Sequence, residues 1–149
     1  MDFNVIILGI AISIIFYEIT NITPGGIVVP GLLALYINQI DRLLYTVGIA
    51  LVTYLIIKLL SRYLVIFGKR RFALAIFISI ILSFLLDLIL PTISFNMLSL
   101  KIIGYTVAGI IANTMLNQGV KKTIPSLAIV LGLIEIILII ASQIGWYNE

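Results

Sequence analysis

The chain has 149 residues, of which 62% are hydrophobic and 10% are charged, and its net charge is +3. Soluble domains carry about 25% charged residues, so this composition excludes a soluble domain and indicates an integral membrane protein. The sequence has no cysteine and no histidine, which excludes disulfides, thiolate nucleophiles, imidazole bases and the usual ligands of zinc and haem.

Apolar stretches follow one another along the chain, separated by glycine, proline, asparagine or charged residues that end helices. They cover residues 4–22, 26–40, 43–66, 72–90, 102–117 and 123–145. A bilayer core needs about 20 helical residues per crossing, so we expect an all-α membrane protein with about six transmembrane segments. The first stretch lacks the basic region and cleavage site of a signal peptide, so we expect it to be retained.

The second and fifth stretches are shorter than ordinary spans. About 15 residues reach only ~22 Å as a helix, which is less than the hydrocarbon thickness of ~30 Å. We expect each to be a broken span or a re-entrant hairpin. Both should lie inside the protein, because unpaired backbone amides are costly in lipid.

The two short stretches share a motif. Residues 26–34, Gly-Ile-Val-Val-Pro-Gly-Leu-Leu-Ala, recur at 104–112 as Gly-Tyr-Thr-Val-Ala-Gly-Ile-Ile-Ala, and each copy runs on to Asn-Gln. We therefore expect two three-helix repeats, residues 1–68 and 69–149. An odd number of spans in each repeat predicts inverted topology.

Glycine-interrupted segments at matching places in two halves point to a polar site at their junction. The residues expected to line this cavity are Gly26, Pro30, Gly31, Asn38 and Gln39 in the first copy, and Gly104, Gly109, Asn113, Asn117 and Gln118 in the second. The alternative is helix packing alone, because small residues four apart let helices approach closely.

Ionisable residues inside the apolar stretches are further candidates, because charges at membrane depth usually face a bundle interior or water. Glu18 and Asp87 hold corresponding late positions in the first and fourth stretches, where an interfacial position is the alternative. Lys58 and Arg62 are four residues apart and can snorkel towards water. Glu135 is too deep for that, so we expect it to be neutral, paired with a cation such as Lys58, or beside water.

Basic residues gather in two loops, and they are Lys69, Arg70, Arg71, Lys121 and Lys122. If all six stretches span, these loops share one side, which the positive-inside rule makes cytoplasmic, and both termini lie outside. If the short stretches are re-entrant, the loops fall on opposite sides. We favour six spans. The clusters are topology determinants and lipid anchors, or a docking site for an acidic partner or substrate.

Along essentially its whole length the chain resembles the membrane subunit of bacterial poly-gamma-glutamate synthase, the PgsC or CapC family. The resemblance rests on Glu18 followed by residues 25–35 and Asn38-Gln39, on residues 68–73, on Asp87 before Pro91, and on residues 109–114 running to Gln118-Gly119. The chain departs from the family pattern at Ala108, where the family has proline, and at Glu135, which has no family counterpart.

The resemblance implies a part in making and exporting a glutamate polymer linked through side-chain carboxyls. The partners it implies are an ATP-dependent amide ligase similar to Mur ligases (PgsB or CapB type), other synthase subunits (PgsA or CapA type), membrane lipid and polyglutamate, with no nucleic acid. The chain has no Walker-type phosphate loop and no acid cluster suited to magnesium. We therefore expect no cofactor here, ATP and Mg²⁺ in the ligase, and an accessory rather than catalytic role.

A polyanionic product needs cations along its path. The basic loop residues would collect it on the cytoplasmic side of the bacterial plasma membrane, and Lys58 and Arg62 would carry it inward. Two other functions stay open: a self-sufficient transporter of a small acid or amino acid, and an anchor that only recruits the ligase. A chain this small can hardly enclose a polymer-wide pore, so we expect an oligomer or a multi-subunit complex.

Overall fold

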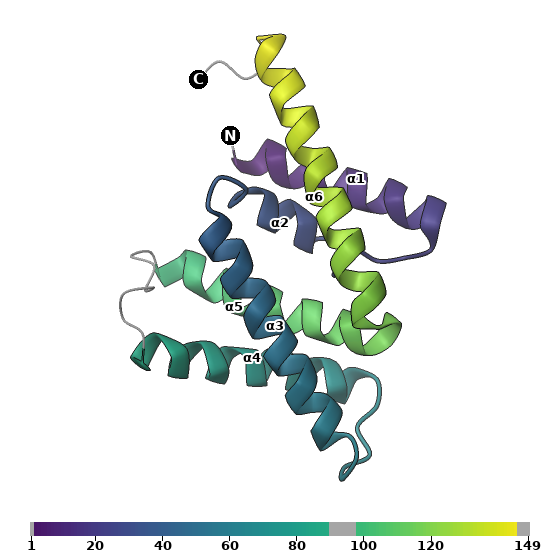
Figure 1. Ribbon diagram of the computed structural model, residues 1–149, viewed down its shortest axis with the longest axis vertical. Coiled ribbons are helices and arrows are strands. Elements are labelled where there is room, and N and C mark those ends of the chain that lie inside the picture. Colours follow the sequence, from purple (N-terminus) through teal and green to yellow (C-terminus); the bar gives the residue numbers. More distant parts are fainter. Residues whose placement is uncertain (1, 90–97, 146–149) are drawn as a thin grey trace. The chain divides into compact units, whose positions relative to one another are not determined.

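A computed structural model describes residues 2–89 and 98–145 (Figure 1). The described chain folds into helices α1 (Asp2–Thr20), α2 (Val29–Ala34), α3 (Ile40–Leu60), α4 (Lys69–Ile89), α5 (Leu98–Gln118) and α6 (Val120–Gln143). The predicted all-helical class is therefore confirmed. Helices α3, α4 and α6 are each long and apolar enough to cross a membrane.

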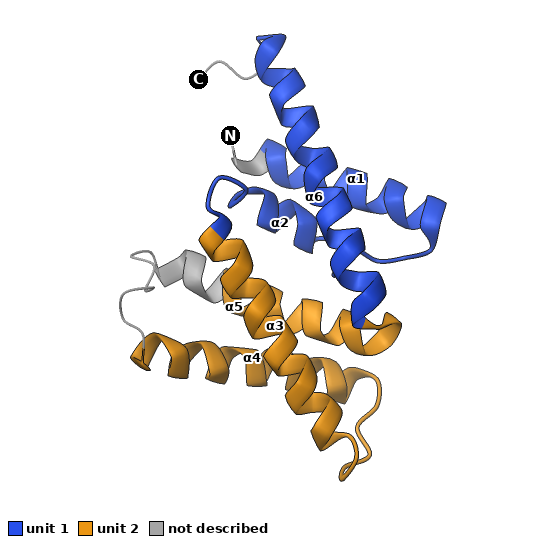
Figure 2. Cartoon of the chain, viewed as in Figure 1, with its two compact units in different colours: residues 1–40, 120–149 blue, residues 41–119 orange. Residues whose placement is uncertain are grey.

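The chain divides into two compact units (Figure 2). Unit 1 is made of residues 1–40 and 120–149 and contains α1, α2 and α6, whereas unit 2 is made of residues 41–119 and contains α3, α4 and α5. Each unit therefore takes helices from both expected repeats, residues 1–68 and 69–149. The repeats and their inverted topology stay predictions.

Small and polar residues form much of the interior, and large apolar side chains point outward. In α4 the buried residues are Ala75, Ser79 and Ser83, whereas Phe77 and Phe84 are exposed. The buried serines bond to carbonyl oxygens, as Ser83 does to that of Ser79 at 2.7 Å, so the hydroxyls of these serines are paired within the apolar helix. This distribution reverses that of a soluble protein and indicates a membrane protein.

The second segment is short and broken, as expected, because α2 has only 6 residues. Residues 21–28 before it are not helical, and Gly25 and Gly26 there have φ angles of 74° and 126°, which glycine adopts without strain. Ala34 lies in one apolar cluster with Val5. Since residue 21 follows the opposite end of α1, residues 21–34 run back along almost the whole of α1, and the choice between a broken span and a re-entrant hairpin stays a prediction.

The fifth segment corrects the sequence prediction. Residues 102–117 were expected to be short and broken or re-entrant, but α5 is a continuous helix of 21 residues, Leu98–Gln118. It begins before the apolar stretch and includes Lys101 in its first turn. Glycine inside a helix costs only about 1 kcal/mol relative to alanine, so Gly104 and Gly109 do not break it. At ~1.5 Å per residue, α5 is about 32 Å long.

Candidate functional site

In unit 2 the second glycine motif is the contact between α5 and α4. A methyl group on Gly109 would lie 2.7 Å from the Cα atom of Ile76, which is closer than real Cβ contacts allow, and 3.0 Å from the carbonyl oxygen of Ala75. Next to this contact, the Ser79 hydroxyl donates to the carbonyl oxygen of Tyr105 at 2.8 Å. Gly109 therefore permits the two helix backbones to meet.

In unit 1 the first glycine motif makes the same kind of contact. A methyl group on Gly31 of α2 would lie 2.6 Å from the carbonyl oxygen of Ile6 in α1, and one on Gly9 would lie 2.3 Å from the Cα atom of Gly31. Pro30, beside Gly31 at the start of α2, is buried as well. These close contacts are what the alternative interpretation, helix packing alone, predicts for the motif. A cavity lined by the motif stays a prediction.

A carboxylate joins the three helices of unit 2. Asp87, near the end of α4, accepts a hydrogen bond from the hydroxyl of Tyr45 in α3 at 3.4 Å and another from the hydroxyl of Tyr105 in α5. All three side chains are half-buried. Both carboxylate oxygens are thus used by phenols from neighbouring helices, so Asp87 connects helix ends at this end of the unit.

We expect the substitution Tyr105→Phe to destabilise the folded protein by about 1.5–3 kcal/mol, because it removes a hydrogen bond to a carboxylate. Tyr63→Phe is the matched control, since Tyr63 is 84% exposed and the change removes the same hydroxyl. Unfolding by denaturant in detergent micelles measures both variants. Equal stability of the two would show that the bond to Asp87 contributes nothing.

The opposite end of the α4–α5 pair is basic. Arg71, in the first turn of α4, donates a hydrogen bond from its terminal guanidinium nitrogen to the side-chain oxygen of Asn117, near the end of α5. The Arg71 Nε atom is buried and has no hydrogen-bond partner among the described residues. Asn117 therefore holds Arg71 in place at this end of the helix pair, where the terminal guanidinium nitrogens can bind an anionic oxygen.

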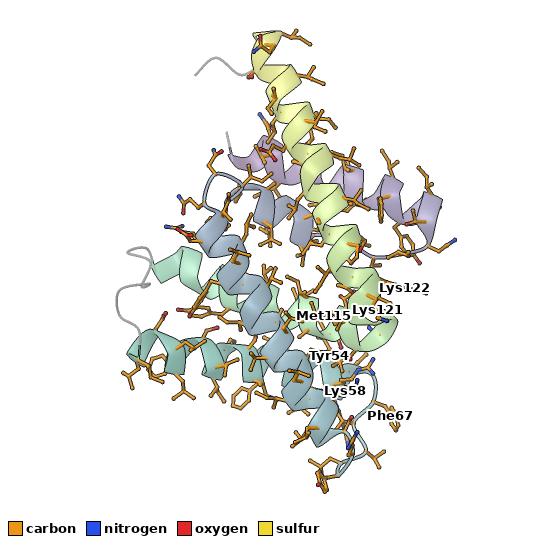
Figure 3. The ribbon with its side chains drawn as sticks, in the orientation of Figure 1. Tyr54, Lys58, Phe67, Met115, Lys121 and Lys122 are labelled. Atoms are coloured by element: carbon orange, nitrogen blue, oxygen red, sulfur yellow. The ribbon has the colours of Figure 1, made fainter. Side chains whose placement is uncertain are left out.

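Further cations lie near this end in unit 2. Lys58, in the last turn of α3, donates to the Tyr54 hydroxyl at 3.2 Å, and its ammonium lies 5.4 Å from the centre of that ring (Figure 3). Arg62, Lys69 and Arg70 are exposed on the segment that links α3 to α4 and at the start of α4. The positions of these side chains agree with snorkelling towards water.

The other predicted site residues are dispersed through the two units. Asn38 and Gln39 are exposed before α3, Lys121 and Lys122 are exposed at the start of α6, and Gly26, Gly104, Asn113 and Gln118 are half-buried. Glu18 in α1 and Glu135 in α6 are exposed, although an enclosed position was one expectation for them. Their place on a polymer path stays a prediction.

Tyr45, Tyr54 and Ser79 escaped the sequence reasoning, and so did the hydroxyl of Tyr105. Tyrosine in an apolar helix is ordinarily an interfacial or packing residue, and nothing near Tyr45 in the sequence indicates Asp87 as its partner. One feature of the sequence could have indicated Tyr105. A carboxylate inside an apolar helix, such as Asp87, needs hydrogen-bond donors, and Tyr105 lies in the glycine motif of the next expected helix.

Comparison with known proteins identifies relatives over most of the chain. A family model described as capsule biosynthesis CapC matches residues 8–124. A protein of Bacillus subtilis (strain 168) named PGA biosynthesis protein CapC is 38% identical over 128 residues, which cover 85% of this chain and 86% of the relative. A capsule biosynthesis protein CapC of Bacillus anthracis is 40% identical over 120 residues, covering 80% of each chain. No solved structure matches the chain.

Proposed function

The chain belongs to the CapC family of capsule biosynthesis proteins, and from that premise we propose that it is a membrane subunit of the machinery that makes and exports poly-gamma-glutamate. In this proposal it binds the ATP-dependent amide ligase and holds or conducts the polyanionic product. ATP and Mg²⁺ act in the ligase, and this chain is accessory to the amide-forming step. Its relatives' names specify capsule or PGA biosynthesis, and the more detailed roles are our inference.

The observation that carries the proposal is the bond between Arg71 and Asn117. This bond brings the start of α4 and the end of α5 together. The basic residues 69–71 therefore lie at the end of unit 2 where α5 ends, and Lys121 and Lys122 follow α5 directly in the sequence. This arrangement supports basic loops on one side of the membrane, where the positive-inside rule makes them cytoplasmic. The termini then lie outside, in a multi-pass chain.

A cluster of cations at one end of a helical unit attracts a polyanion arriving from the cytoplasm. Lys69 and Arg70 are exposed and make no ion pair with any residue in the described ranges, so their charge is available to an acidic ligase surface or to polyglutamate. Lys58 lies further along α3 and extends the positive region. Together these residues supply an entry for a chain of carboxylates.

The proposal is tested by isolating the protein in mild detergent from cells that also make the other synthase subunits. We expect a Mur-like ligase to co-purify. We expect the double variant Lys69→Gln/Arg70→Gln to retain about two- to tenfold less ligase, since exposed ion pairs contribute up to ~1 kcal/mol each. Raising the salt concentration should reproduce this loss.

The matched control is the double variant Arg42→Gln/Lys101→Gln. It also removes two positive charges, but from the first turns of α3 and α5 and not from the basic end of unit 2. Ligase recovery should not change. If no ligase accompanies the unmodified protein, or if both double variants lose it equally, the proposed docking role is wrong.

A further inference from the structure

Helix α6 has two exposed strips of very different composition. One strip is bulky and apolar, and its members are Ile129, Leu133, Ile136 and Ile140. The other, which we call the α6 notch, consists of the exposed residues Pro125, Ala128 and Glu135 and the half-buried Gly132. The spacing of three, four and three residues places the notch on one helix face. Lipid chains suit the bulky strip, but they do not explain a small-residue strip that contains a carboxylate.

Glu135 lies deep within the apolar length of α6. It follows Lys122 by about 20 Å along the helix, at ~1.5 Å per residue, and residues 123–134 between them are uncharged. An exposed carboxylate at that depth costs several kcal/mol in lipid unless a cation or donor meets it. Among the described residues Glu135 has no bonded partner.

The chain's own cations are all at the ends of helices or between them. Its nine lysines and arginines are Arg42, Lys58, Arg62, Lys69, Arg70, Arg71, Lys101, Lys121 and Lys122. Each lies in a first turn, a last turn or a connecting segment of the described helices. No lysine or arginine occupies the middle of a helix, so helices that cross the membrane place the cations of this chain, and those of a second copy, near the membrane faces.

The notch has room for another helix. A methyl group added to Gly132 would meet nothing within 4 Å, and Ala128 is exposed one turn earlier. The buried side of α6 is a different face, which includes Val130 and Ile134 in the core of unit 1. Small residues four apart on an uncovered face let a second helix backbone approach closely within a membrane.

We propose that the α6 notch binds a transmembrane helix of another subunit that carries a lysine or arginine at its middle, paired with Glu135. The inference rests on the proposed placement of α6 across the membrane and not on the identity of the polymer. A second copy packed in parallel through this face would bring two Glu135 carboxylates to the same depth, where they repel each other. Charge complementarity therefore favours a different chain.

The test uses the full chain in lipid bilayers, labelled with a donor dye through Gln143→Cys. The native sequence has no cysteine, so the dye attaches at this position alone. The probe is a synthetic leucine- and alanine-rich transmembrane peptide with one central lysine and an acceptor dye. We expect energy transfer with this peptide and not with a peptide that has leucine at its centre. The substitutions Glu135→Gln and Gly132→Leu should each weaken association roughly three- to thirtyfold.

Two variants act as controls. Leu133→Ala changes the bulky strip and should leave association unchanged, and Glu135→Asp keeps the charge and should retain binding. Unchanged association of Glu135→Gln would overturn the proposal, as would equal binding of the leucine peptide. Energy transfer between two labelled copies that depends on Glu135 would show that the partner of the notch is a second copy of this chain and not a different subunit. Because neither ligase nor polymer is present, failure here leaves the proposed biosynthetic function untouched.

Discussion

Replacing Gly109 by leucine is expected to abolish accumulation of the folded protein. Even alanine at this position would place its methyl group 2.7 Å from the Cα atom of Ile76 and from the hydroxyl oxygen of Ser79. The first neighbour is backbone and cannot rotate away, so α5 must move off α4. Overpacking of this kind costs about 1–3 kcal/mol for a small addition, and leucine adds three more carbon atoms to the same contact.

The matched control is Gly104→Leu in the same helix and the same motif. A methyl group on Gly104 meets nothing within 4 Å, so a leucine there can extend outward, and helix propensity improves by up to ~1 kcal/mol. The measurement is the yield of monodisperse protein in detergent and its midpoint of thermal unfolding, with Gly109→Ala as the intermediate case. If Gly104→Leu is as harmful as Gly109→Leu, the motif serves something other than the α4–α5 contact.

Removing the Arg71 side chain is expected to weaken polymer binding by roughly ten- to a hundredfold. The guanidinium is half-buried and is held by Asn117 at the basic end of unit 2. Under the proposed function it donates charge-assisted hydrogen bonds to polyglutamate carboxylates, each worth about 1.5–3 kcal/mol. Binding of purified poly-gamma-glutamate to Arg71→Ala in detergent, followed by calorimetry, measures the loss. Arg71→Lys should be intermediate, because lysine keeps the charge without the planar fork.

Arg70→Ala separates this local effect from net charge. Arg70 is exposed, next to Arg71, and carries the same charge, so its removal should weaken binding several times less. Asn117→Ala should also weaken binding, because it releases the Arg71 side chain from its position while leaving every charge in place. Equal losses for Arg70→Ala and Arg71→Ala would mean that the polymer responds to charge density alone, and unchanged binding in both would remove the polymer from this end of unit 2.

The same glycine contact in both units gives the repeated motif a structural reason. Gly31 lets α2 meet α1, and Gly109 lets α5 meet α4. The third helix of each unit, however, comes from the other half of the sequence, since α6 belongs to unit 1 and α3 to unit 2. A division of the chain at residue 68 therefore describes the sequence pattern and not the compact units.

Composition and spacing by themselves determined the helical class, the apolar segments, the short second segment and the position of the basic residues at helix ends. These properties depend on nearest neighbours along the chain and on the thickness of a bilayer, so they can be read locally. The length of α5 was misjudged for the same reason. Glycine and a terminal lysine look like helix ends in isolation, but a helix held by α4 tolerates both.

Only the tertiary structure decided which residues meet. Asp87 lies 18 residues from Tyr105 and 42 from Tyr45, and Arg71 lies 46 residues from Asn117, so no periodicity relates these partners. The two glycines marked by the motif, Gly104 and Gly109, are alike in sequence, yet one faces open space and the other a helix backbone. That difference depends on which face of α5 packs against α4, because a side chain's neighbours within a bundle are set by helix packing and not by its position in the sequence.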